Sequence, residues 1–173
     1  MYHFFATFIT SNHFSDRRKY VDSYFDDISQ KEMFSINENV FQATCWGHIT
    51  WQSPGQTCFQ RNQFTFIGSA RLDNFDELLS ECGDKNISSS SELILYLFEK
   101  YQETCFERLE GDFGFLIWDS EKQQVWCIKD QVGIRPLFYL KLGDLTVFSS
   151  SISAIRAYVG KKNLSINKKY VAK

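Results

Sequence analysis

Two stretches rich in large apolar side chains place the tightest limit on how this chain can fold. Residues 64–68 read Phe-Thr-Phe-Ile-Gly, and residues 113–117 read Phe-Gly-Phe-Leu-Ile. Successive side chains of a strand point to opposite faces, so apolar residues on both faces require cover on both sides. The sequence therefore predicts strands that lie inside a layered structure rather than on its surface.

The other predicted elements follow in the order strands, helices, strands and helix. Strands are predicted over residues 2–9, 40–51 with a break at Gly47, 57–59, 63–72, 112–118, 125–129, 137–140 and 145–149, with a turn over 60–62. Helices are predicted over 16–28 with Ser15 as N-cap, 75–81 with Asn74 as N-cap, from a Ser89–Glu92 capping box to Tyr101, and over 152–158 up to Gly160. Leu93, Leu97 and Tyr101 share one face of the third of these helices. This order favours an α+β fold with antiparallel sheets and outer helices.

Length and composition exclude several classes of protein. The chain has 173 residues, which suits one domain with a full core. Its 19 basic and 21 acidic residues indicate no nucleic-acid partner, and no apolar run reaches the roughly 18 residues of a membrane span. Five widely spaced cysteines and three histidines favour neither a disulfide framework nor a metal site. We therefore expect a cytoplasmic domain over residues 1–160 and a basic tail or linker over residues 161–173.

Residues 109–119 (LEGDFGFLIWD) and 129–139 (KDQVGIRPLFY) carry the most specific pattern in the chain. They resemble the L-x-G-x-F-x-F-x-x-W-D and R-D-x-x-G-x-[KR]-P-L-[FY]-Y signature of the glutaminase domain of asparagine synthetase. That domain is a class II glutamine amidotransferase of the N-terminal nucleophile (Ntn) hydrolase type. The resemblance covers roughly residues 65–170, and it implies a four-layer αββα sandwich of two antiparallel sheets flanked by helices.

The signature residues are expected to be structural or interdomain rather than catalytic. Gly133 is expected to take a positive φ in a turn, and Pro136 to set the direction of the following strand. The full set is Gly111, Phe113, Trp118, Asp119, Asp130, Gly133, Arg135 and Pro136. We also expect part of an interdomain face in residues 129–139 and the basic tail.

The catalytic positions implied by the resemblance are all changed. A working member removes its initial Met and uses the exposed Cys as nucleophile on glutamine, whereas Tyr2 stands at that position here. Tyrosine has a pKa of about 10 and is a poor nucleophile near neutral pH. The Asn-Gly pair of the oxyanion hole corresponds to Ser69 and Ala70, and the acidic residue that holds the glutamine amine corresponds to Ser90. The sequence therefore predicts a degenerate site with no catalytic residue.

A degenerate site of this kind is similar to that of β-lactam synthetase and the lasso-peptide cyclases. In those enzymes a C-terminal domain uses ATP and Mg²⁺ to activate a carboxylate, and it carries an S-G-G-x-D-S loop that this chain lacks. The resemblance implies a structural domain without a cofactor of its own. Its expected partner is an adenylating synthetase domain, in cis or in trans, and the whole enzyme would take a peptide or amino-acid substrate.

Two alternatives to this structural role stay open at this point. The domain could bind a peptide or an amino-acid-like ligand without chemistry. It could also be an active, glutamine-hydrolysing amidotransferase of asparagine synthesis that uses an unrecognised nucleophile. Homo-oligomerisation is compatible with each of these functions.

Overall fold

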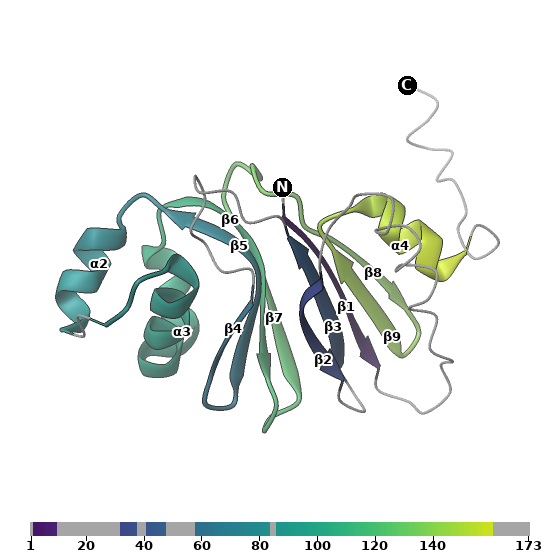
Figure 1. The fold of residues 1–173 in the computed structure, drawn as a ribbon, viewed down its shortest axis with the longest axis horizontal. Coiled ribbons are helices and arrows are strands. Elements are labelled where there is room, and N and C mark those ends of the chain that lie inside the picture. The colour runs from purple at the N-terminus through teal and green to yellow at the C-terminus, as the bar shows by residue number, and fades with distance from the viewer. Residues whose placement is uncertain (1, 10–31, 38–40, 48–57, 84–85, 161–173) are drawn as a thin grey trace.

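A computed structural model describes residues 2–9, 32–37, 41–47, 58–83 and 86–160. Two antiparallel sheets pack face to face, and helices cover the outer face of each sheet (Figure 1). The predicted α+β sandwich with four layers is therefore confirmed. The predicted helix over 16–28 and the basic tail over 161–173 lie outside the described residues.

The five-stranded sheet has β1 (Tyr2–Ile9) at its centre. Its order is β2 (Glu32–Asn37), β3 (Phe41–Gly47), β1, β9 (Leu145–Ser149) and β8 (Phe138–Leu142). Helix α4 (Ile152–Val159) covers the outer face, where Tyr158 packs on Phe5 with the ring centroids 5.0 Å apart. The prediction of α4 and its end before Gly160 is confirmed, whereas the short strand β2 was missed.

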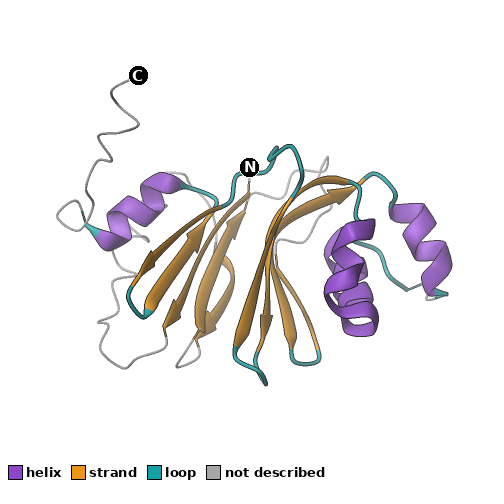
Figure 2. Cartoon of the chain, turned by 180° about the vertical axis from the view of Figure 1, so that it is seen from behind, coloured by secondary structure: helices purple, strands orange, loops and turns teal. Residues whose placement is uncertain are grey.

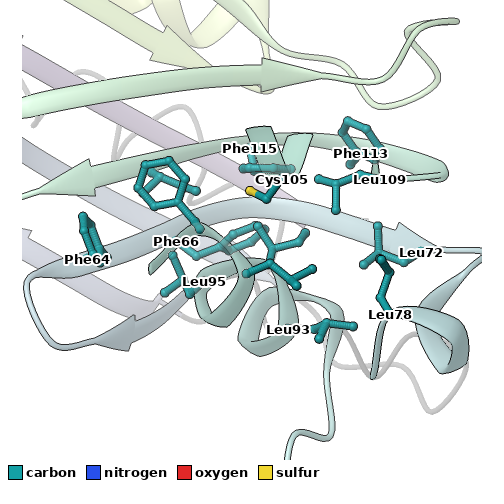
Figure 3. Close-up of a cluster of buried hydrophobic side chains, with 14 of the residues drawn as sticks. Phe64, Phe66, Leu72, Leu78, Leu93, Leu95, Cys105, Leu109, Phe113 and Phe115 are labelled. Atoms are coloured by element: carbon teal, nitrogen blue, oxygen red, sulfur yellow. The ribbon is translucent and has the colours of Figure 1, made fainter. Parts of the chain in front are cut away.

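The four-stranded sheet has the order β4 (Cys58–Arg61), β5 (Phe64–Leu72), β6 (Gly111–Asp119) and β7 (Gln124–Lys129). Its outer face packs against α2 (Phe75–Cys82), α3 (Ser90–Tyr101) and the 3₁₀ segment η1 (Gln102–Arg108). Figure 2 shows α2 and α3 on one side of the two sheets and α4 on the other. In Figure 3 the side chains of Phe66, Leu95 and Phe115 meet between the sheet and these helices.

A separate apolar cluster fills the space between the sheets. Its buried members are Phe4, Ala6, Ile67, Leu116, Trp118, Leu137 and Phe148. Phe66 on β5 faces the helices while its neighbour Ile67 faces the other sheet, and both are fully buried. Alternate side chains of residues 64–68 and 113–117 thus pack against the helices on one face and against the other sheet on the opposite face. The sequence predicted this burial of both faces.

Gly68 allows the two long strands β5 and β6 to approach closely. It has φ +143°, and a Cβ placed there would lie 2.5 Å from the carbonyl oxygen of Gly114 and 2.6 Å from the Cα of Phe115. Both contacts are with backbone, so a side chain could be accommodated only by separating the strands.

Some local predictions were wrong in detail. Residues 60 and 61 belong to β4, and the chain turns at Asn62, which takes φ 52°. The Asn74 side chain does not cap α2, because it binds the backbone of Arg108 and Glu110. Helix α3 ends at Tyr101 as predicted, and this residue is 36% exposed.

The predicted capping box is formed in a modified way. The Ser89 hydroxyl accepts from the backbone N–H of Glu92, but the Glu92 carboxylate accepts from Ser88 instead of Ser89. Within the described part of the chain, no helix combines the length and apolar character needed to cross a membrane.

Candidate functional site

The position predicted for the nucleophile lies at the beginning of the central strand. Tyr2 is the first residue of β1, and its Cα partner on β3 is Gly47. Two residues later, Phe4 packs between the sheets in the same cluster as Leu137. Figures 1 and 2 both show the start of β1 beside the connection that links β7 to β8, and Leu137 is the last residue of this connection.

The positions predicted for the oxyanion hole lie within β5. Ser69 pairs with Gly114 on β6, and Ala70 pairs with Phe113. Strand β4 pairs with β5 only over 64–67, so among the described residues β5 has a strand partner beyond residue 67 on the β6 side alone. Ser69 supplies a hydroxyl where the family resemblance implies an Asn amide.

The position predicted for the amine anchor is brought to the same end of β5. Ser90 begins α3, and its Oγ accepts from the backbone N–H of Leu72 at 3.4 Å. A neutral hydroxyl cannot form an ion pair with an ammonium group, and this one already serves to join α3 to β5. Ser90 therefore lies beside the end of β5 that follows Ser69 and Ala70, and none of these three residues provides a carboxylate.

The start of β1 lies towards the same end of the sandwich. Phe8 contacts Trp118 with ring centroids 5.8 Å apart, and Trp118 is the Cα partner of Thr65. Nearer the start of β1, Phe4 packs in the same cluster as Leu137. A Cβ placed on Gly114 would lie 3.4 Å from the Cβ of Leu137, so Leu137 lies close to Gly114. Gly114 is the partner of Ser69. These contacts place the start of β1 and the Ser69–Gly114 pair towards the same end of the sandwich.

The cysteines of the described residues do not occupy these positions. Cys45 lies on β3, and Cys58, Cys82, Cys105 and Cys127 also lie outside β1, β5 and the start of α3. Burial raises the pKa of Cys105 to about 12. Because the thiolate is the nucleophilic form, Cys105 is a poor nucleophile near neutral pH.

Asp130 organises the connection between β7 and β8. Its buried carboxylate accepts from the backbone N–H of Phe113 on β6 at 3.2 Å and from those of Ile134 at 2.9 Å and Arg135 at 3.2 Å. It also accepts from the N–H of Gly133, which takes φ +77° as predicted. Desolvation raises the pKa of Asp130, but these four hydrogen bonds together outweigh it and lower that pKa.

The other signature residues contribute to strands and turns. Gly111 begins β6 with φ +139°, and Phe113 and Trp118 are buried on opposite sides of that strand. Asp119 is buried at the end of β6, where its Oδ1 accepts from the N–H groups of Glu121 and Lys122. Pro136 precedes Leu137 and β8.

Sequence reasoning pointed to residues 129–139 as a contact face but did not single out Val132 and Ile134. Both are exposed, and the available signal was their position in a segment that also holds Gly133 and Pro136. The described residues include no group of three or more His, Cys, Asp or Glu side chains that could hold a metal ion.

Comparison with known proteins identifies relatives over most of these elements. Residues 48–157 match a family described as "Glutamine amidotransferase domain". Asparagine synthetase [glutamine-hydrolyzing] 3 of Bacillus subtilis is 29% identical over 111 residues, which are 62% of this chain and 18% of that protein. Asparagine synthetase [glutamine-hydrolyzing] 1 of the same organism is 27% identical over 114 residues, 64% of this chain and 18% of that protein.

A solved structure has the same fold. Glutamine phosphoribosylpyrophosphate amidotransferase from B. subtilis, complexed with ADP and GMP, superposes with a TM-score of 0.62 and 16% identity. The match covers 91% of this chain and 43% of that one. The matched region of the two curated asparagine synthetases is 18% of their length, so the chain corresponds to a small part of each.

Proposed function

This chain belongs to the glutamine amidotransferase domain family, and on that premise we propose that it is a catalytically degenerate member. In this proposal it acts as a structural domain of an asparagine synthetase-related, ATP-dependent enzyme that forms amide bonds. The observation that carries the proposal is the set of residues at the three positions that the family resemblance implies. Tyr2 begins the central strand, Ser69 and Ala70 lie in β5, and Ser90 begins α3.

Each of the three changes removes a different part of glutamine hydrolysis. Tyrosine in place of cysteine removes the thiol nucleophile. Serine and alanine in place of Asn-Gly remove a side-chain amide from the oxyanion hole, where loss of one donor costs roughly 10²–10³ in kcat. Serine in place of an acid removes the charge that would hold the substrate's ammonium group. Together these changes support a domain that does not hydrolyse glutamine.

The proposal assigns the chemistry to a partner. An ATP-dependent domain, in cis or in trans, would activate a carboxylate with ATP and Mg²⁺, and an amine of the substrate would close the amide without ammonia. We propose that the chain is similar in this respect to β-lactam synthetase and the lasso-peptide cyclases. In such an enzyme the present domain is retained for its scaffold.

Ammonia release from glutamine by the purified 173-residue chain tests the proposal. We expect no release above the enzyme-free blank, while a glutamine-hydrolysing asparagine synthetase from B. subtilis in the same assay provides the positive control. Release within about tenfold of that control would overturn the proposal.

Two further measurements identify the source of any activity. Intact mass spectrometry reports whether Met1 is retained, and a retained Met1 excludes an N-terminal nucleophile at Tyr2. A Cys45→Ala variant tests the cysteine that pairs with Phe4 in the register of β3 and β1. Ammonia release that disappears in this variant would identify Cys45 as an unrecognised nucleophile.

A further inference from the structure

Strands β7 and β8 are the outer strands of their sheets, and both lie at the same end of the sandwich. Strand β1 faces β5, β9 lies next to β1, and β6 lies next to β5. Beyond β9 lies β8, and beyond β6 lies β7; the connection over 130–137 links β7 to β8. We call residues 129–141, which include this connection, the 129–141 edge.

The 129–141 edge holds most of the exposed large apolar side chains of the described residues. Val132 is 84% exposed, Tyr139 69%, Ile134 57% and Phe138 38%. Only Tyr101 and Ile152 are also in this class within the described residues, so four of the six lie in eight consecutive positions. Phe138 and Tyr139 are successive residues of β8 and point to opposite faces of its sheet, so the exposed apolar side chains lie on both sides of the edge rather than in one flat patch. Exposed apolar residues grouped in one segment mark a contact surface more often than single ones, which are ordinary.

The edge is held in place before any partner binds. Asp130 ties the backbone of Gly133, Ile134 and Arg135 to β6 through Phe113. A Cβ placed on Gly114 of β6 would lie 3.2 Å from the Cβ of Arg135 and 3.1 Å from its carbonyl oxygen. The connection therefore packs directly on β6. A rigid surface loses little conformational entropy on binding, which favours a specific contact.

Three cations lie on the edge without an anionic partner among the described residues. Lys129 and Lys141 are exposed, and Arg135 is half-buried with its Nε enclosed and lacking a hydrogen-bond acceptor. The single acid of the segment is Asp130, whose oxygens already accept four backbone N–H groups. The edge therefore combines an apolar centre with unpaired positive charge.

These features distinguish between four classes of partner that could bind the edge. A second copy in a symmetric contact would bring the same three cations close together, which is unfavourable. A lipid surface could attract the cations but could not pair the outer backbone groups of β8. A nucleic acid would match the cations but not the aliphatic side chains of Val132 and Ile134. A protein surface can satisfy all of these groups.

We infer that the 129–141 edge is the docking face for another protein surface with an apolar centre and carboxylates that pair with Lys129, Arg135 and Lys141. That this surface belongs to an ATP-dependent, amide-forming domain rests on the proposed function. Because Leu137 and Phe4 share a cluster, the docked surface would lie beside the start of β1 and would cover the degenerate site.

Site-specific photocrosslinking of the full chain in its native cells tests the inference. p-Benzoylphenylalanine replaces Tyr139, and in a control chain it replaces Glu121, which is exposed on the turn at the other end of β7. We expect an adduct at position 139 at least tenfold stronger than at position 121. Its partner peptide should contain Asp or Glu beside apolar residues and should come from an ATP-dependent, amide-forming polypeptide.

A Lys129→Glu/Lys141→Glu double variant supplies the matched test of charge. Both residues are exposed, so the thermal midpoint should not change, while the adduct should fall at least tenfold. Adducts with a second copy, a phospholipid, a nucleic acid or a protein of another class would overturn the inference, as would equal adducts in the double variant. The ammonia assay does not depend on this surface. A chain that releases no ammonia but crosslinks to another class of molecule would therefore refute the docking face and leave the proposed loss of glutamine hydrolysis standing.

Discussion

Replacement of Asp130 by asparagine tests whether one buried carboxylate organises the connection between β7 and β8. Oδ1 accepts from Gly133 and Ile134, and Oδ2 accepts from Phe113 and Arg135. Asparagine keeps one acceptor oxygen, but its NH₂ group then faces two N–H donors. Hydrogen bonds to a charged group contribute about 1.5–3 kcal/mol each. We expect Asp130→Asn to lower the free energy of unfolding by about 2–4 kcal/mol, since the connection can relax in part.

Urea unfolding followed by tryptophan fluorescence measures this difference, with Glu121→Gln as a control that removes one exposed carboxylate. The folded-state pKa of Asp130 is lowered, so its contribution is present above the unfolded-state pKa of about 3.9 and is lost as the pH falls through the folded-state value. The gap between wild type and Asp130→Asn should therefore be full at about pH 7 and shrink below about pH 4. A gap below about 0.5 kcal/mol at pH 7, or one that is unchanged by acid, would refute the reasoning.

Two further predictions concern the sheets and their helices. Gly68→Ala should lower the free energy of unfolding by at least about 3 kcal/mol, because its Cβ would meet the backbone of Gly114 at 2.5 Å. Gly83→Ala, with φ +70° and no atom within 4 Å of the new Cβ, should cost only about 1 kcal/mol, and equal losses in urea unfolding would contradict the steric argument. Cys105 should react with iodoacetamide at pH 8 at least about a hundredfold more slowly in the native chain than in urea, since burial raises its pKa to about 12; peptide mass mapping measures both rates, and equal rates would show that the thiol is accessible.

Much of the fold was accessible because its signals are local. A strand's two faces follow from the alternation of side chains along the backbone, so Phe66 and Ile67 could be assigned to opposite sides without knowledge of their neighbours. Strand β2 (Glu32–Asn37) was missed, although the alternation of Phe34 and Ile36 with Ser35 and Asn37 was a signal for it. The candidate positions Tyr2, Ser69, Ala70 and Ser90 came from the resemblance to a family and not from any local pattern.

The sequence by itself determined most of the strands, their order with the helices, and the residue types at the candidate site. Only the tertiary structure decided which groups meet. Asn74 bonds to Arg108 and Glu110 across 34 and 36 positions rather than capping its own helix, and Asp130 finds Phe113 across 17 positions. A polar group takes the partners that the packed chain brings within hydrogen-bond reach, and those partners come from distant segments. For the same reason the exposure of Val132 and Tyr139 beside unpaired cations became visible only once the sheets had been assembled.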